Sequence, residues 1–224
     1  MSAAPTVLSA EEHVSLLAAT ERVTQTTLDH LNANPNKTFA VTFVANLQRG
    51  VDSITQTAIT QGEQFDCKAG CSHCCHVRVE ALEPEVFQIV HALQDLAPDS
   101  LEDIISRLQR HENKTKHHSI ADYRSPCPFL QQNLCSIYPV RPAACRKVHS
   151  YDVEQCEDAG ANIPQSLEVI LKSEALMKGT ANAYQQAKLA ASGHDLGRAV
   201  LLALTDEAAE SRWYKGESVF NKIV

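Results

Sequence analysis

The sequence predicts a mainly α-helical protein: an irregular helical domain with two cysteine-rich loops closing on a metal site. Two observations favour helix. Glycine is scarce, at 8 residues, whereas alanine, which favours helices more than glycine does, occurs 28 times in the 224-residue chain. Apolar residues also recur at three- and four-residue steps through most long segments. We expect a single domain over residues 1–224, with residues 65–150 as its cysteine-cluster core.

The N-terminal third is predicted to form two helices. Residues 9–33 form the first, because Ser9 and Glu12 have the spacing of a capping box. A second helix is expected over about 38–60, where an apolar stripe runs unbroken up to the first cysteine loop. The residues expected on the inner faces of these helices are Val14, Leu17, Leu28 and Leu31, then Phe43, Leu47, Val51, Ile54 and Ala58.

Two more helices are expected between the cysteine loops. Pro84 suits the first turn of one helix, and Asp99 with Glu102 can cap the next. The polar stretch RHENKTKHH, residues 110–118, is predicted to be an exposed connection. The inner faces would carry Val86, Ile89, Val90 and Leu93 in the first of these helices, and Leu101, Ile104, Ile105 and Leu108 in the second.

The remainder is predicted to be an irregular loop followed by helices. Residues 122–150 are rich in proline and cysteine, and the chain returns to helix from about 165. Gly179 and Gly193 are expected to stop helices, and Asp195 to cap a last one. The inner positions expected in these helices are Leu167, Ile170 and Leu171, then Val200, Ala203 and Leu204.

Charge and hydropathy exclude several function classes. The net charge of −7 argues against general nucleic-acid binding, and we expect no membrane contact because no apolar run is long enough to cross a bilayer. The N-terminus lacks the pattern of a secretory signal, so a cytoplasmic location is expected. Clustered cysteines in a reducing compartment bind metal more often than they form disulfides. In an oxidising compartment, the eight cysteines could instead form four disulfides.

Seven cysteines in two loops are the candidate metal ligands. Seven thiols exceed the four that one structural zinc ion requires. Either several metal ions share bridging thiolates, or some cysteines support the ligands without touching metal. The cofactor could be zinc, iron or an iron–sulfur cluster. The candidate ligands are Cys67, Cys71, Cys74, Cys75, Cys127, Cys135 and Cys145.

Charged and imidazole groups accompany these cysteines. From Arg124 to Ser150 the chain has four basic residues and no acidic one, and Arg141 and Arg146 could offset thiolate charge. A solvated basic loop is the alternative. Cys156 has acidic neighbours and is expected outside the site. The histidines beside the cysteines could replace a thiolate but are expected to be exposed loop residues; they are His73, His76 and His149.

Three motifs in order, CKAGCSHCC, CPFL and CSIYPVRPAACR, resemble the YkgJ-type cysteine-cluster family, whose signature is CxxCxxCC. The resemblance covers residues 67 to about 146 and implies a zinc- or iron-chelating domain. The first gap of this sequence holds three residues where the family has two, which sets Cys67 apart from the other three cysteines of the loop.

An enzymatic role is left open by the sequence. The C-x3-C-x2-C spacing also occurs in radical S-adenosylmethionine enzymes, but no alternation of strands and helices follows Cys75 here. A similar cysteine cluster in flagellin lysine methylases implies, by resemblance, an S-adenosylmethionine-dependent methylase-like or redox enzyme, although no G-x-G-x-x-G occurs after a strand. Glu80, Glu83 and His76 are the nearest acid–base candidates, and each is expected on the surface, so no catalytic residue is assigned.

The third class of function is a metal-stapled interaction module. Trp213 and Tyr214 could anchor a partner, but packing on the protein's own core is the expectation. The sequence identifies no substrate, protein partner or oligomeric state.

Overall fold

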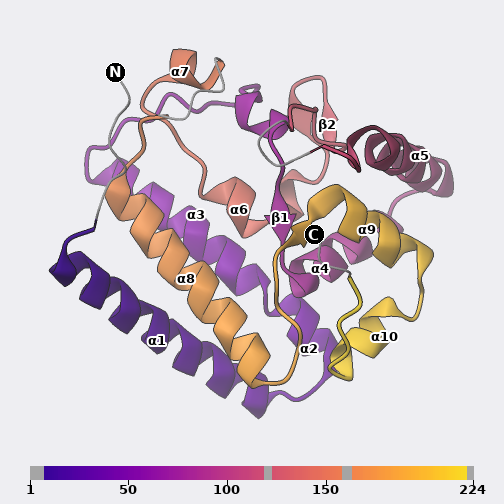
Figure 1. The fold of residues 1–224 in the computed structure, drawn as a ribbon, viewed down its shortest axis with the longest axis horizontal. Helices are drawn as coiled ribbons and strands as arrows, with labels where there is room; N and C mark the ends of the chain where they lie inside the picture. Colours follow the sequence, from indigo (N-terminus) through magenta and orange to yellow (C-terminus); the bar gives the residue numbers. More distant parts are fainter. Residues whose placement is uncertain (1–7, 119–122, 158–162, 221–224) are drawn as a thin grey trace.

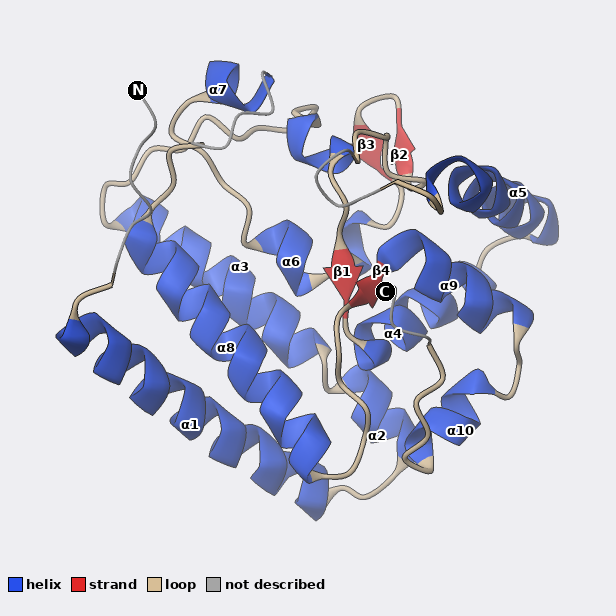
Figure 2. Cartoon of the chain, viewed as in Figure 1, coloured by secondary structure: helices blue, strands red, loops and turns tan. Residues whose placement is uncertain are grey.

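The computed structural model describes residues 8–118, 123–157 and 163–220, and it is mainly helical, as the sequence predicts (Figure 2). The α-helices are α1 (Ala10–Ala33), α2 (Lys37–Thr42), α3 (Ala45–Thr60), α4 (Glu83–Gln94), α5 (Pro98–Thr115), α6 (Ala143–Arg146), α7 (Val153–Glu157), α8 (Leu167–Gln186), α9 (Leu196–Thr205) and α10 (Ala209–Tyr214). Two short 3-10 helices are η1 (His73–His76) and η2 (Tyr138–Val140). Strand β1 (Glu80–Ala81) pairs antiparallel with β4 (His194–Asp195), and β2 (Leu130–Gln131) with β3 (Leu134–Cys135).

The helices form two groups with the cysteine segments at one end. Helix α8 lies between α1 and α3 in one layer, whereas α4 packs against α2 and α9 in the other group (Figure 1). In the same view α7 and β2 lie near the top, whereas α6 lies beside α3 in the middle of the molecule. Among the described residues, none of the helices is long and apolar enough to cross a lipid bilayer.

Helix α1 begins as predicted but buries a different face. Ser9 caps it in a complete capping box with Glu12. The expected inner residues Val14 and Leu17 are 64% and 50% exposed, which is a wrong prediction. The residues buried against the protein are instead Thr20, Thr24, Thr27 and Leu31.

Gly179 explains why threonines can fill the contact between α1 and α8. The glycine was expected to stop a helix, but it lies within α8. A Cβ at this position would lie 2.6 Å from Val23 Cβ and 2.7 Å from the Thr20 carbonyl oxygen. The missing side chain therefore allows close approach of the two backbones, and small threonines suit such a contact better than leucines do.

Other helix ends differ from expectation for identifiable reasons. The single helix expected over 38–60 is divided after α2, where the Val44 N–H bonds to the Val41 carbonyl, three residues back. Helix α8 ends at Gln186, and Lys188, just beyond its C-cap Ala187, has a left-handed φ of 62°, so Gly193 is not its stop. The inner residues expected near its start, at 167, 170 and 171, are only partly buried.

Helices α4 and α9 confirm their predicted starts, whereas α5 does not. Pro84 lies in the first turn of α4, and the Asp195 side chain caps α9 by accepting from the Arg198 N–H. Helix α5 starts after Ala97 without a side-chain cap, and Asp99 is only an acidic residue in its first turn. It continues to Thr115, so most of the stretch expected as an exposed connection is helical.

The largest core cluster surrounds Phe87 of α4. Trp213 is fully buried beside it, with ring centroids 5.3 Å apart, and donates its indole N–H to the Ala190 carbonyl at 2.7 Å. The expectation that Trp213 packs on the protein's own core is confirmed. Tyr184 of α8 reaches the same cluster and donates to the Ala40 carbonyl at 2.6 Å.

Candidate metal centre

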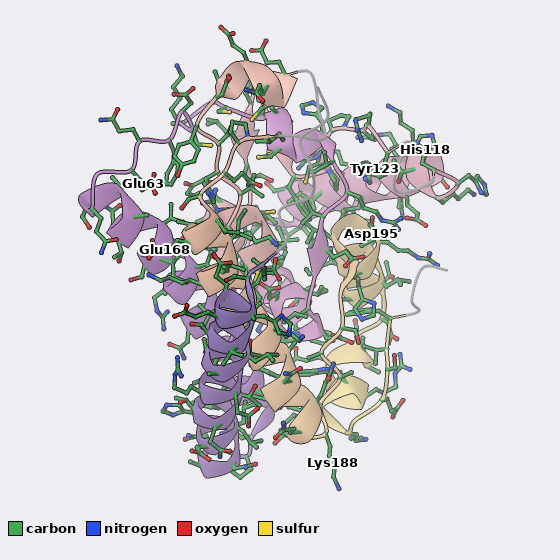
Figure 3. All side chains as sticks on the ribbon, turned by 60° about the vertical axis from the view of Figure 1, so that its left-hand side comes forward. Glu63, His118, Tyr123, Glu168, Lys188 and Asp195 are labelled. Carbon is green, nitrogen blue, oxygen red and sulfur yellow. The ribbon has the colours of Figure 1, made fainter. Side chains whose placement is uncertain are left out.

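Backbone hydrogen bonds bring the two cysteine loops together. The Cys127 N–H donates to the Cys75 carbonyl at 2.7 Å, and the Ser125 N–H donates to the His76 carbonyl at 3.2 Å. Helix η1, which carries Cys74 and Cys75, therefore lies along the start of the second loop. Segments about 50 residues apart in the sequence meet here through their backbones. In Figure 3 the sulfur atoms lie mostly in the upper part of the view, beneath α7.

The second loop folds as a hairpin and two short helical turns. Gln132 and Asn133 form the two-residue hairpin turn, with φ values of 48° and 62°. This left-handed pair matches the twist of the flanking strands and places Cys135 at the end of β3. Helix α6 then carries Cys145.

Four thiols form an inner group, defined here as Cys75, Cys127, Cys135 and Cys145. The charges of Cys127, Cys135 and Cys145 act to raise the pKa of Cys75, and those of Cys127 and Cys135 act to raise the pKa of Cys145. Burial raises the pKa of Cys127 to about 11, and it also raises the pKa values of Cys135 and Cys145. A hydrogen bond from the Cys74 thiol lowers the pKa of Cys75 and raises that of Cys74. Without a metal, most of these sulfurs are therefore protonated near neutral pH.

Three of the other four thiols form an outer group, defined here as Cys67, Cys71 and Cys156, whereas Cys74 belongs to neither group because its charge raises the pKa values of Cys67 and Cys127 alike. Burial raises the pKa of Cys67, and the charges of Cys71, Cys74 and Cys156 raise it further. Cys156, which the sequence placed outside the site, thus lies close to the first loop. All eight cysteines fall within the described residues and are free thiols.

The two arginines singled out from the sequence have different surroundings. Arg141 stacks on Tyr138, with its guanidinium carbon 4.0 Å from the ring centroid, and its buried Nε has no hydrogen-bond partner in the described structure. Its positive charge opposes the burial that raises the pKa values of Cys135 and Cys145. Arg146 instead pairs with Asp52 of α3 and donates to the carbonyls of Arg141 and Pro139.

His149 is buried, contrary to the expectation of an exposed loop residue. The Ser166 N–H donates to its Nε2 at 2.9 Å, so its Nδ1 carries the proton that is donated to the Lys147 carbonyl at 2.8 Å. Both nitrogens are used, which makes His149 unsuitable as a metal ligand. His73 is near Glu157, at 3.6 Å, and His76 contacts the Ser72 carbonyl through Nδ1 at 3.0 Å.

Two carboxylates at the start of α4 are buried, one of which, Glu85, the sequence analysis did not single out. Glu83, expected on the surface, is 1% exposed; it contacts His194 Nε2 at 2.8 Å and accepts from the Ser192 N–H at 2.7 Å. Glu85 is 2% exposed and accepts from the Ala143 N–H at 2.7 Å. Ala143 is the first residue of α6, so Glu85 fixes the helix that carries a cysteine. Acidic residues in the first turn of a helix are ordinary, so the sequence carried no signal for this role.

A histidine and a tyrosine anchor the start of the second loop. Tyr123 lies near the C-terminal end of α5, beside His118 (Figure 3), and its hydroxyl is 2.6 Å from His111 Nε2. Burial lowers the pKa of His111, so the tyrosine hydroxyl donates to the unprotonated nitrogen. Further along, Arg107 of α5 donates to the Pro128 carbonyl at 3.1 Å. Helix α5 thus holds both sides of Cys127.

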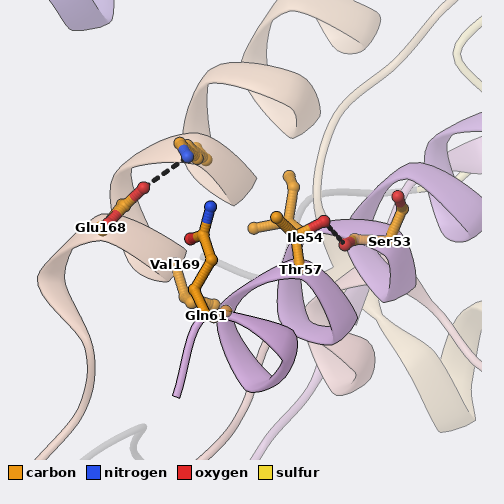
Figure 4. A pocket seen from close by; sticks show the side chains of 8 residues that line it. Ser53, Ile54, Thr57, Gln61, Glu168 and Val169 are labelled. Carbon is orange, nitrogen blue, oxygen red and sulfur yellow. Dashed lines mark hydrogen bonds and ion pairs between the residues drawn. The ribbon is translucent and has the colours of Figure 1, made fainter. Parts of the chain in front are cut away.

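The side chains do not form a finished ligand set. In the described part of the chain, no three Cys, His, Asp or Glu side chains are grouped so that they could hold a metal ion. A separate pocket of about 100 Å³ lies between α3 and α8 (Figure 4). Its lining includes the Glu168–Lys172 ion pair and contains no cysteine; the lining residues are Ser53, Ile54, Thr57, Ala58, Gln61, Glu168, Val169 and Lys172.

Residues 66–165 match the family model CxxCxxCC, described as "Putative zinc- or iron-chelating domain". The matched segment contains all eight cysteines. No curated protein and no solved structure matches the chain. The resemblance inferred from the three cysteine motifs is therefore confirmed, and the match supports metal binding by this part of the chain.

Proposed function

Starting from that family match, we propose that the protein binds zinc or iron through thiolates of its two cysteine loops. The ligands are drawn from the seven cysteines predicted from the sequence, and the inner group of Cys75, Cys127, Cys135 and Cys145 is the proposed primary set. Four thiolates satisfy the coordination of a structural zinc ion and also that of a common iron–sulfur cluster. Binding requires the thiols to turn towards one another from their described positions.

The donor chemistry of the inner group fits such a cation. Burial raises the pKa values of Cys127, Cys135 and Cys145, so these thiols keep their protons until a positive charge arrives. A metal cation supplies that charge and displaces the protons when it binds. The site is also lined by sulfur, which soft and borderline ions prefer to oxygen.

Arg141 is the observation that carries the proposal. A buried guanidinium N–H without a partner is unfavourable, and such groups in native structures call for an explanation. Nε of Arg141 is buried and has no hydrogen-bond partner in the described structure, and the positive charge of Arg141 acts to lower the pKa values of Cys74, Cys135 and Cys145. Four thiolates around a divalent ion carry a net negative charge, which Arg141 would offset. We assign Arg141 to this role, and Arg146 to holding the loop on α3 through Asp52.

The proposed consequence of binding is to close the two loops over the helices. Metal binding to a site that is incomplete without metal contributes directly to folding free energy. Here the cation would connect η1, the hairpin and α6, which the described structure links through a few hydrogen bonds.

The test is metal content after anaerobic purification, with two matched variants. Wild type should retain zinc or iron in stoichiometric amounts, and visible absorption separates an iron–sulfur cluster from colourless zinc. Cys145→Ser should lose the tightly held metal, whereas Ala144→Ser adds a hydroxyl to the same turn of α6 and should retain it. Absence of stoichiometric metal from wild type, or full retention by Cys145→Ser, would refute the proposed ligand set.

A further inference from the structure

Helix α7 lies beside the first cysteine loop and contacts it at both ends (Figure 1). Asp66 Oδ2 accepts from the Val153 N–H, the first of the helix, at 3.1 Å. At the last residue of the helix, Glu157 Oε1 lies 3.6 Å from His73 Nε2, and the helix packs against η1. These contacts span residues 66–73 of the first loop.

The chain that leads into α7 is anchored in the body of the protein. Ser150 is 2% exposed, and its carbonyl accepts from the Asp66 N–H at 2.9 Å. Tyr151 donates its hydroxyl to Glu63 at 2.6 Å and its N–H to the Pro164 carbonyl at 3.0 Å. The start of the segment is therefore fixed independently of α7.

Helix α7 itself is held weakly. None of the residues Val153–Glu157 is buried, and the carboxylates that contact the loop at its two ends, Asp66 and Glu157, belong to exposed residues. A single helical turn is not stable without tertiary support. Elements with few buried contacts open locally at a small fraction of the free energy of global unfolding. We therefore expect α7 to leave the loop far more often than the whole protein unfolds.

Two aspartates cap α7, and their effects are separable. Asp152 belongs to the same segment and accepts from the N–H groups of Glu154 and Gln155, at 2.9 and 3.3 Å, which supports the first turn locally. Asp66 belongs to the first loop and accepts from the Val153 N–H, so this bond exists only while the helix is docked. The Asp66 cap thus couples the order of α7 to the position of the loop.

We propose that α7 is a detachable clamp on the first cysteine loop, and that its docking slows release of the metal bound by the two loops. This inference rests on the proposed function for the metal and adds control of the release rate. The other links of the first loop to the second lie near η1; they are backbone hydrogen bonds and the Ser72–Asn133 contact at 3.3 Å. Undocking of α7 therefore frees residues 66–71, and the loop can then move its thiolates away from the metal.

Hydrogen exchange of the metal-free, reduced protein tests the docking. In wild type, the amides of α7 should exchange much faster than those of α8, which buries residues along its length. Asp66→Ala removes the cap and should speed exchange in α7 and in residues 66–73. Asp66→Asn is the matched control, because its amide oxygen can still accept from the Val153 N–H although the negative charge is lost.

Zinc release to a chelator from the zinc-loaded full-length protein tests the consequence. Asp66→Ala should release zinc about fivefold faster than wild type, which is the factor expected for loss of one helix cap. Asp66→Asn should release zinc at a rate close to that of wild type. Since Asp66 is exposed, both variants should unfold in urea at the midpoint of wild type.

Three results would overturn the clamp alone. They are α7 amides that exchange as slowly as those of α8, equal zinc release by wild type and Asp66→Ala, and equal acceleration by Asp66→Ala and Asp66→Asn, which would assign the effect to charge. A lowered urea midpoint in Asp66→Ala would also overturn it, because the contact would then support the whole fold. A wild-type protein that retains neither zinc nor iron would instead refute the proposed function, and control of metal release with it.

Discussion

Replacing Glu85 by alanine should destabilise the protein by removing the anchor of α6. The Glu85 carboxylate accepts from the Ala143 N–H at 2.7 Å and from the Leu82 N–H at 3.1 Å, and the residue is 2% exposed. Alanine can accept neither bond. The change therefore leaves two backbone N–H groups unpaired where little water reaches them.

The expected magnitude follows from these two groups. An unpaired buried donor costs roughly 1–3 kcal/mol, so two cost roughly 2–6 kcal/mol. Removing a buried charge offsets part of this, because burial raises the pKa of Glu85 and so disfavours its ionised form. We expect a net loss of about 2–4 kcal/mol in the free energy of unfolding, which is a large share of a typical domain's stability.

Urea unfolding of the metal-free, reduced protein, followed by circular dichroism, measures this loss. Glu102→Ala is the matched control, because Glu102 is an exposed carboxylate on α5 and its replacement should change stability by less than about 0.5 kcal/mol. The variant Glu85→Ala should also bind zinc more weakly, since Ala143 and Cys145 share a turn of α6. Unfolding energies within about 0.5 kcal/mol of wild type would refute the assignment of Glu85 as the anchor.

Two further predictions concern packing and pH. Gly179→Ala should lower the free energy of unfolding by about 1–3 kcal/mol, because the added Cβ meets the Thr20 backbone and the Val23 side chain. Gly50→Ala is the control and should leave stability almost unchanged, because its Cβ meets only the flexible end of Leu176. Equal unfolding energies for the two variants would contradict the close contact of α1 and α8. Since the folded pKa of Glu85 is raised above its ordinary 4.5, its contribution to stability is present below pH 4.5 and is lost as pH rises through the folded pKa. The unfolding energy of wild type minus that of Glu85→Gln should therefore fall as pH rises from 4.5, and a difference that rises or stays level would show that the pKa is not raised.

Local signals in the sequence predicted local structure well. The Ser9–Glu12 capping box, Pro84 in a first turn and the Asp195 cap each act within one helical turn, and all three are confirmed. The cysteine motifs likewise located the segment that matches the CxxCxxCC family model, because the spacing of the cysteines can be read directly from the sequence. Such features need no knowledge of what the helix packs against.

Features that depend on distant partners were not predictable in this way. Glu85 resembles any acidic residue near a helix start, and its role depends on Ala143, 58 residues away. Glycine commonly ends helices, yet Gly179 lies within α8, where its lack of a side chain is required by the close contact with Val23 of α1. Cys156 has acidic neighbours in sequence, and only the docking of α7 places it near Cys67. In each case the deciding contact is tertiary, and local propensity cannot represent it.

The two cysteine loops are held unequally, and this difference bears on how a metal would be captured. Side chains from three helices fix the second loop: Asp52 of α3 through Arg146, Glu85 of α4 and Arg107 of α5. The first loop is joined to it mainly by backbone hydrogen bonds and by the exposed contact of Ser72 with Asn133 at 3.3 Å. The second loop is thus the more preorganised half, and the entropy lost on closing the site falls mostly on the first. Anchoring from α3, α4 and α5 would therefore lower the free-energy cost of the proposed binding, although none of these three helices carries an inner-group cysteine.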